Sequence, residues 1–148
     1  AGNIRLDDDR ITDERIHYVL SRMGADSVFS GLENGLDTMT RERGFRLSQG
    51  QRQLVSFARA LAADREILVL DEATSSVDTF TEGLIQKAVP ILMEGRTSIV
   101  VAHRLSTVRT VDRIHVIARG KIRETGAHNE LIALNGLYAK LSRMHFEG

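Results

Sequence analysis

Two mostly apolar segments, separated by a stretch with helical spacing, constrain the fold of this chain more than any other feature. The first, Ile67 to Leu70, contains no polar residue and is followed by Asp71 and Glu72. The second, Thr97 to Ala102, is followed by His103. Short runs of this kind are typical of strands buried on both faces. Together with the helix between them they predict a parallel pair, and hence an α/β fold with the three polar side chains at one edge of the sheet.

Helical signals precede the first strand. Thr12 is a favoured N-cap residue, and apolar residues recur at helical spacing from there until Gly24, which predicts a helix between them. Residues 25–46 contain glycines that separate short segments, and this indicates a short helix plus loop. Ser48, with Gln51 three positions later, has the sequence of a capping box, so a second long helix is expected to begin at or just after Ser48.

A third helix is predicted between the two strands. It begins at about Thr79, because Thr79 and Glu82 have the spacing of a capping box, and Gly95 is its stop. Pro90 lies inside this segment and predicts a kink or a break.

The remainder of the chain is predicted to form a hairpin followed by helices. Residues 114–118 and 121–124 have strand character and are joined by the turn at Arg119 and Gly120. Two short helices, separated by Asn135 and Gly136, complete the predicted order of elements.

The composition narrows the classes of protein that remain. The 148 residues include 20 Lys and Arg and 20 Asp and Glu, so a zero formal net charge gives no electrostatic reason to expect nucleic acid as a partner. The absence of cysteine excludes disulfides and thiolate metal sites. No apolar stretch approaches the roughly 20 residues of a membrane-spanning helix. The first residues lack the features of a signal peptide, and we expect the chain to be cut from a longer protein.

Three short motifs could carry chemistry. The segment from Leu47 to Gln51 opens a helix, where free N–H groups and the helix dipole favour an anion, although Ser48 could simply cap the helix. Asp71 and Glu72 follow a strand, where one carboxylate could hold Mg²⁺ and the other could orient water, although such pairs are often only solvated strand ends. His103 could donate to a phosphate or hold the attacking water, although a lone histidine is more often structural.

In this order the motifs resemble the nucleotide-binding domain of ABC transporters, in particular the exporter branch. The resemblance covers essentially the whole chain. It rests on residues 47–53, 67–78 and 99–104, and additionally on 3–6, 40–44 and 126–131, which resemble the segment after the Q-loop, the exporter X-loop and the entry to the C-terminal helices. It implies an α/β P-loop NTPase (RecA-like) fold with a partial parallel sheet plus a helical signature subdomain. The implied parts are 1–11 after the Q-loop, 12–64 as the helical subdomain, 65–126 as the partial RecA-like core and 127–148 as C-terminal helices.

The resemblance also assigns roles to residues. The signature motif, which contacts the γ-phosphate of ATP held by the opposite domain of a head-to-tail pair, corresponds to Leu47, Ser48, Gln49, Gly50 and Gln51. Gln49 replaces the glycine that is more usual there, a change that we expect to be tolerated.

The remaining roles fall on the strand ends and the loop between them. Asp71 corresponds to the Walker B aspartate on Mg²⁺, Glu72 to the catalytic glutamate that polarises water, and His103 to the switch histidine. Ser76 and Asp78 match the D-loop that crosses the dimer interface. A glutamate at position 72 favours a hydrolytic site.

One part of such a site is missing from the sequence. A P-loop needs GxxxxGK followed by Ser or Thr, but Gly-Lys occurs once, at Gly120 and Lys121, with Ile122 after it. We therefore expect the C-terminal half of a nucleotide-binding domain, inactive alone and truncated before the Walker A region. The strand that precedes His103 would then have an unpaired apolar edge that invites self-association.

The leading hypothesis is a membrane exporter driven by an ATP-sandwich dimer on the cytoplasmic face of the membrane. ATP and Mg²⁺ are the implied cofactors. A second nucleotide-binding domain, identical or different, and the transmembrane domains facing residues 12–64 are the implied partners, with no nucleic acid expected. A soluble ABC-type ATPase of DNA repair or translation is the alternative, although its DNA-acting members would carry a coiled coil before Leu47. A non-catalytic dimerisation module would be expected to lack Glu72 or His103, and both are present.

Overall fold

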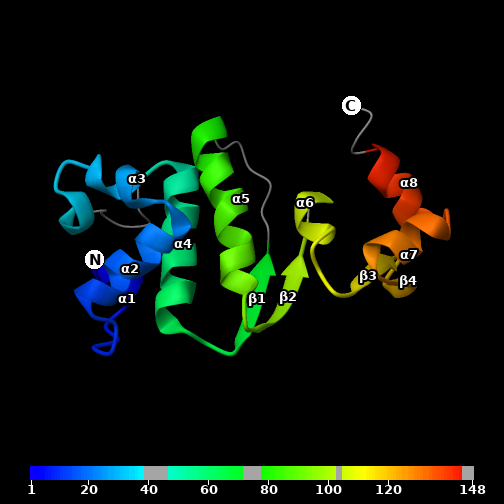
Figure 1. Cartoon of the computed structure of the whole chain (residues 1–148), viewed down its shortest axis with the longest axis horizontal. Helices are drawn as coiled ribbons and strands as arrows, with labels where there is room; N and C mark the ends of the chain where they lie inside the picture. Colours follow the sequence, from blue (N-terminus) through cyan, green and yellow to red (C-terminus); the bar gives the residue numbers. More distant parts are fainter. Residues whose placement is uncertain (39–46, 72–77, 103–104, 145–148) are drawn as a thin grey trace. The chain divides into compact units, whose positions relative to one another are not determined.

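The computed structural model describes residues 1–38, 47–71, 78–102 and 105–144 (Figure 1). These residues form two compact units, Ala1–Val100 and Val101–Gly148. The elements of the first unit are α1 (Gly2–Arg5), α2 (Asp13–Met23), α3 (Asp26–Ser30), the 3₁₀ turn η1 (Gly35–Asp37), α4 (Gln49–Ala63), β1 (Ile67–Asp71), α5 (Thr79–Met93) and β2 (Thr97–Val101). Those of the second are α6 (Leu105–Val108), β3 (Ile114–Ala118), β4 (Lys121–Gly126), α7 (His128–Ala133) and α8 (Leu137–Met144).

The helices predicted before the first strand are present. Thr12 caps α2 by accepting a hydrogen bond from the backbone N–H of Arg15, and Gly24 ends the helix with a left-handed φ of 66°. Such a φ is readily adopted by glycine because it has no Cβ. The short helix plus loop predicted for 25–46 corresponds to α3 and η1, with 39–46 outside the described residues.

The core of the first unit lies between α2, α4 and α5. Leu54, Phe57, Ala58 and Leu61 of α4 form one buried face. That face packs with buried residues of the two neighbouring helices, which explains why three helices with polar outer faces stay together. The fully buried large side chains of this cluster are Ile16, Leu20, Met23, Leu54, Ile85 and Leu92.

The parallel pair predicted from the sequence is confirmed, since β1 and β2 are neighbours and their arrows run the same way in Figure 1. The prediction that both strands are buried on two faces is wrong. Leu70 is buried, whereas Ile67, Val69 and Ile99 are 66%, 69% and 59% exposed. Successive side chains of a strand point to opposite faces, so one face of this sheet packs on the core and the described residues leave the other uncovered.

Helix α5 begins at Thr79 as predicted, but its cap is different. The carboxylate of Asp78 accepts a hydrogen bond of 2.9 Å from the backbone N–H of Thr81, so the predicted capping box of Thr79 with Glu82 is wrong. A carboxylate at the N-cap is favoured because it also interacts with the positive end of the helix dipole. The helix continues past Pro90 to Met93 without a break, since Pro90 is exposed while the opposite face of the helix is buried.

The second unit contains the predicted hairpin and helices. Strands β3 and β4 are antiparallel, and Arg119 and Gly120 both have positive φ, as the tight turn between them requires. The carboxylate of Glu124 accepts hydrogen bonds from the N–H groups of Leu137 (2.5 Å) and Tyr138 (2.9 Å), and so holds the start of α8 against β4. A separate apolar cluster forms here around Val116, Leu131 and Tyr138.

Two helices were not predicted, α1 and α6. Both have four residues, too few to show a helical pattern in the sequence. Within the described residues, no helix is long and apolar enough to cross a membrane.

Candidate functional site

The start of α4 is built around a capping box at Ser48. The Ser48 hydroxyl accepts a hydrogen bond of 3.2 Å from the N–H of Gln51, and the Gln51 side chain accepts one of 2.9 Å from the N–H of Ser48. Leu47 is buried, and its carbonyl accepts a hydrogen bond of 2.6 Å from Arg52. Gly50 is buried in the first turn, while Ser48 and Gln49 are exposed. The segment therefore presents Ser48 on the surface at the positive end of a long helix.

Capping leaves the Ser48 hydroxyl able to donate a hydrogen bond. A serine hydroxyl has one donor and two acceptor positions, and the cap uses one acceptor. The proton can therefore point at an external oxygen while the lone pair holds the Gln51 N–H. The structural and the anion-binding interpretations of Ser48 are thus compatible, and a negatively charged ligand would be favoured there by the helix dipole.

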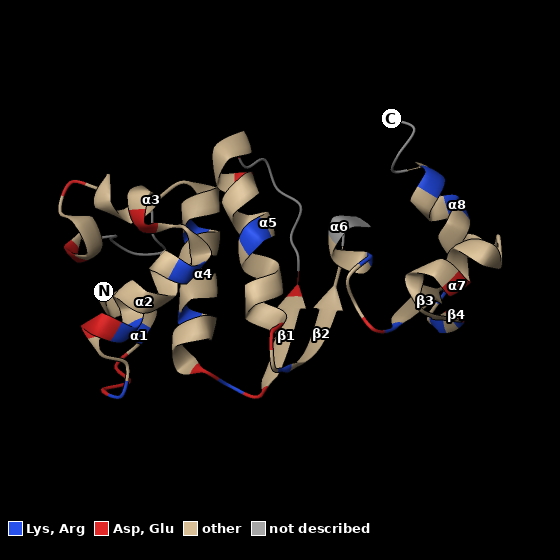
Figure 2. Cartoon of the chain, viewed as in Figure 1, with Lys and Arg blue, Asp and Glu red and all other residues tan. Residues whose placement is uncertain are grey.

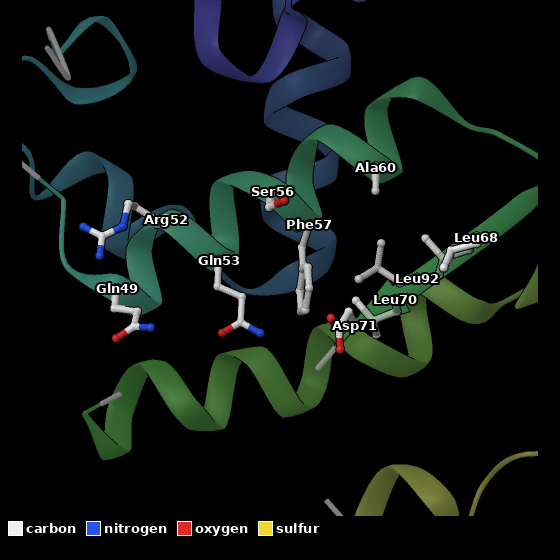
Figure 3. Close-up of a pocket in the computed structure, with 11 residues that line it drawn as sticks. Gln49, Arg52, Gln53, Ser56, Phe57, Ala60, Leu68, Leu70, Asp71 and Leu92 are labelled. Carbon is white, nitrogen blue, oxygen red and sulfur yellow. The ribbon is translucent and has the colours of Figure 1, made fainter. Parts of the chain in front are cut away.

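Asp71 is the last residue of β1 and is exposed. It borders a hollow of about 430 Å³ between α4 and β1 (Figure 3). Figure 3 shows Gln49, Gln53 and Phe57 extending from α4 toward the space beside this strand end. Four consecutive residues of β1, Leu68 to Asp71, line the hollow, so it runs along the edge of the strand and not only over one face.

Asp78 is placed by its role as the cap of α5. Hydrogen bonds from the backbone and side chain of Thr81 hold the pKa of the Asp78 carboxyl below its ordinary value of 3.8. The carboxylate is exposed, and it stays ionised at neutral pH. The ionised carboxylate can therefore interact with a partner molecule while it caps α5.

Three of the predicted site residues, Glu72, Ser76 and His103, lie outside the described residues. Of the rest, the structure brings Gln49 and Asp71 to one hollow and places Asp78 at the start of the next helix. Among the described residues there is no group of three or more His, Cys, Asp or Glu side chains that could hold a metal ion.

The same hollow is also lined by Arg52, Gln53 and Ser56, none of which was predicted as a site residue. A signal for them was available. Gln49 and Gln53 are four positions apart, and Ser56 follows three later, so these polar residues share a helix face beside the apolar one.

In this α/β fold a parallel strand pair, whose first strand ends in an aspartate, follows a helix that opens with a capped Ser-Gln-Gly segment, an arrangement consistent with the nucleotide-binding domain of a P-loop NTPase. A family model described as "ABC transporter" matches residues 2–75, half of the chain. The chain therefore belongs to the ABC transporter family.

Comparisons with individual proteins agree. The chain is 50% identical over 141 residues to the "Probable multidrug resistance ABC transporter ATP-binding/permease protein YheH" of Bacillus subtilis, covering 95% of the chain and 21% of that protein. It is 48% identical over 143 residues to an "ATP-dependent lipid A-core flippase" of Desulfotalea psychrophila, covering 97% of the chain and 25% of the flippase.

A solved structure gives the same result for the fold. The "Structure of a bacterial Atm1-family ABC exporter with ATP bound" matches with a TM-score of 0.83 and 35% identity, covering 97% of this chain and 25% of that one. The chain thus has the features of an exporter ATP-binding domain, and it spans about a fifth to a quarter of the length of these relatives.

Proposed function

We propose that this chain is part of the ATP-binding and ATP-hydrolysing subunit of an ABC membrane exporter. The observation that carries the proposal is the exposed Ser48 at the capped start of α4, in a chain that resembles an ATP-bound exporter over 97% of its length. In this proposal, residues 12–64 form the helical subdomain, 65–126 the partial RecA-like core and 127–148 the C-terminal helices, with 1–11 following the Q-loop.

The signature segment acts on a nucleotide held by a second domain. Two nucleotide-binding domains pair head to tail, and Ser48 donates a hydrogen bond to the γ-phosphate that the opposite domain holds. Leu47 anchors the segment in the core, and Gly50 belongs to the first turn that faces the phosphate. A hydrogen-bond donor that is already oriented toward the phosphate does not have to move when negative charge develops in the transition state. The cap holds Ser48 in such a fixed position, and this suits it to the role.

Asp71 and Glu72 act on the nucleotide of their own domain. Asp71 offers an exposed hard oxygen ligand at the carboxyl end of a strand, and this fits Mg²⁺, which is commonly held by one or two carboxylates plus phosphates and water. When bound, the ion neutralises phosphate charge. Glu72 orients and polarises the attacking water, and His103 donates to the transferring phosphate. Ser76 and Asp78 contact the partner domain.

The partners and place of the longer protein follow from the same assignment. A second copy or a related half supplies the opposing domain, and the transmembrane domains contact residues 12–64 at the cytoplasmic face of the membrane. The 148-residue chain alone is expected to be inactive because its sequence has no P-loop to hold the β- and γ-phosphates.

The test compares ATP hydrolysis by two preparations: the 148-residue chain, and the longer protein that contains it in lipid. We expect hydrolysis only from the longer protein, and a loss of about 100-fold or more in kcat for Glu72→Gln, because the amide cannot accept a proton from water. Glu66→Gln is the matched control, since Glu66 is an exposed glutamate before β1.

Two results would contradict the proposal. One is tight MgATP binding or turnover by the 148-residue chain alone. The other is a Glu72→Gln variant of the longer protein that hydrolyses ATP as fast as Glu66→Gln.

A further inference from the structure

A single arginine connects the far end of α4 to the turn that leads into β2. Arg96 lies between α5 and β2, and its side chain is only 10% exposed. It donates a hydrogen bond of 2.7 Å from Nη1 to the carbonyl of Leu92 in the last turn of α5. It donates a second, also 2.7 Å, from Nη2 to Oδ1 of Asp64. The guanidinium therefore joins the carboxyl ends of two helices.

Asp64 is the residue that ends α4, with a left-handed φ of 47°. Its other carboxylate oxygen lies 3.6 Å from Nη2 of Arg15, on α2, and Arg15 also donates to the carbonyl of Leu61 in α4. The hydrogen bond from Arg96 keeps the pKa of the Asp64 carboxyl below its ordinary value. Figure 2 shows acidic and basic residues together in the loop that follows α4.

This arrangement is better suited to fixing a direction than to adding stability. Asp64 is 69% exposed, and exposed ion pairs contribute little to the free energy of folding. Arginine differs from lysine in presenting a rigid, planar set of donors, so two acceptors on different helices are held at a defined angle. The nearly buried guanidinium of Arg96 has both of these acceptors.

Arg96 joins the C-terminal end of α4 to the C-terminal end of α5, and these two elements connect to different parts of the proposed site. Ser48 caps the start of helix α4 and Asp64 caps its end, so the direction of the helix sets the position of Ser48. Arg96 is followed directly by Thr97, the first residue of β2, whose N–H bonds the carbonyl of Glu66 before β1. His103 follows β2 in the sequence.

We propose that Arg96 and Asp64 are positioning residues for ATP hydrolysis, which act by holding the signature helix in a fixed direction relative to the strands that carry Asp71 and lead to His103. The inference rests on the proposed function. Neither residue touches nucleotide in this account. Their loss changes how Ser48 meets the phosphate of the opposite domain while the fold persists.

The chain contains a matched control. Arg22, in the last turn of α2, donates a hydrogen bond of 2.6 Å to Glu94, which follows α5, and its side chain is 40% exposed. This pair also joins two helix ends in the same unit, and its two residues lie on α2 and directly after α5, not on α4. Replacing Arg22 removes an ion pair of similar geometry and leaves the proposed connection intact.

The experiment measures ATP hydrolysis by the longer protein carrying Arg96→Met, Asp64→Gly, both, or Arg22→Met. Glycine suits the left-handed conformation at position 64, so that variant removes the carboxylate without backbone strain. We expect each single change at 96 or 64 to lower kcat about tenfold with KM for ATP within about twofold, since small misplacements of catalytic groups carry such costs. The double variant should be no slower than the slower single variant.

A rescue and an activity-independent measurement complete the test. Asp64→Asn keeps one acceptor for Arg96 and should retain most of the activity. In the 148-residue chain, hydrogen exchange should become faster in both the last turn of α4 and β2 for Asp64→Gly, and in neither for Arg22→Met.

Three results would overturn the inference: unchanged kcat in both single variants, a fall in kcat that only follows the fraction of unfolded protein, or faster exchange in α4 without β2. Failure of the proposed function is a separate result, seen when Glu72→Gln leaves hydrolysis intact.

Discussion

At the scale of single residues, Ser48 shows how one hydroxyl group can serve structure and chemistry together. Its oxygen accepts the Gln51 N–H, and its proton remains available to a phosphate. Aspartate would cap the helix equally well, but it has no proton to give at neutral pH and carries a negative charge. Serine is therefore distinguished from other good caps by what it offers to a ligand and not by what it does for the helix.

This distinction gives the first prediction. In the 148-residue chain, Ser48→Ala should lower the free energy of unfolding by about 1 kcal/mol, and Ser48→Asp should leave it nearly unchanged. In the longer protein both variants should hydrolyse ATP more slowly, Ser48→Asp most of all because its carboxylate repels phosphate. Urea unfolding and steady-state hydrolysis measure the two effects. Equal hydrolysis by Ser48→Asp and the parent would remove Ser48 from the site.

The second prediction concerns Gly136, which precedes α8. A Cβ added there would clash with the Oε1 atom of Glu124 and lie 2.9 Å from its Cδ, so the carboxylate would have to release the N–H groups of Leu137 and Tyr138. Gly136→Ala should destabilise the second unit by about 1–2 kcal/mol through these lost hydrogen bonds.

Gly83 provides the opposite case for comparison. It lies inside α5, and a Cβ added there meets no atom within 4 Å. Gly83→Ala should stabilise the first unit by about 0.5–1 kcal/mol, because alanine loses less conformational entropy in a helix. Thermal unfolding followed by circular dichroism measures both variants. Effects of the same sign would show that Gly136 is not required for the hydrogen bonds of Glu124 to α8.

At the scale of elements, the start of α5 depends on an ionised side chain, which gives the third prediction. Because the pKa of Asp78 is lower in the folded chain, the stability it contributes is fully present above the unfolded value of 3.8 and is lost as the pH falls through the folded value. Asp78→Asn keeps a cap that does not titrate. We expect the midpoint of thermal unfolding to fall less steeply with decreasing pH in this variant. The same pH dependence in the variant and the parent would contradict the role of the Asp78 carboxylate as the cap of α5.

The elements also show how much the sequence predicts. Helix α2 was predictable because its cap, apolar spacing and stop all agree, and α4 because its capping box and apolar face agree. The turn at Arg119 and Gly120 was predictable from its residues and the strand patterns beside it. The Ser48 capping box was predicted down to its partner, Gln51. These signals are local, so no knowledge of the rest of the molecule was needed.

Other features depend on tertiary packing and were not readable. An apolar run such as Ile67 to Leu70 does not reveal whether both faces of the strand are covered, because the same run of residues is compatible with a sheet covered on one face or on two. Pro90 leaves α5 intact because the buried face opposite it holds the helix together. The hydrogen bond from Arg96 to Asp64 joins residues 32 positions apart, and the sequence does not indicate which arginine pairs with which carboxylate.

At the scale of the whole molecule, the uncovered face of the β1–β2 sheet gives the fourth prediction. Ile67, Val69, Ile99 and Val101 are more than half exposed, and neither strand contains a lysine or proline that would protect it. With no net charge to keep copies apart, the 148-residue chain should self-associate as its concentration rises. Light scattering should show this, and Val69→Thr with Ile99→Thr should reduce it.

A matched control is Phe80→Ser, which removes a large apolar side chain that is 64% exposed on α5 and not on either strand. We expect it to leave the association unchanged. A parent chain that stays monomeric at every concentration would show that the exposed sheet face does not mediate self-association.

The two separate apolar clusters have a thermodynamic consequence for all of these measurements. One cluster holds the helices of the first unit, and the other, around Leu131 and Tyr138, holds the second. We expect each cluster to lose its packing in a transition of its own, so that heat is absorbed in two events and the calorimetric enthalpy exceeds the van't Hoff value of either. A melting temperature is then a property of a cluster, and every substitution described above has to be assigned to the transition in which its own neighbours take part.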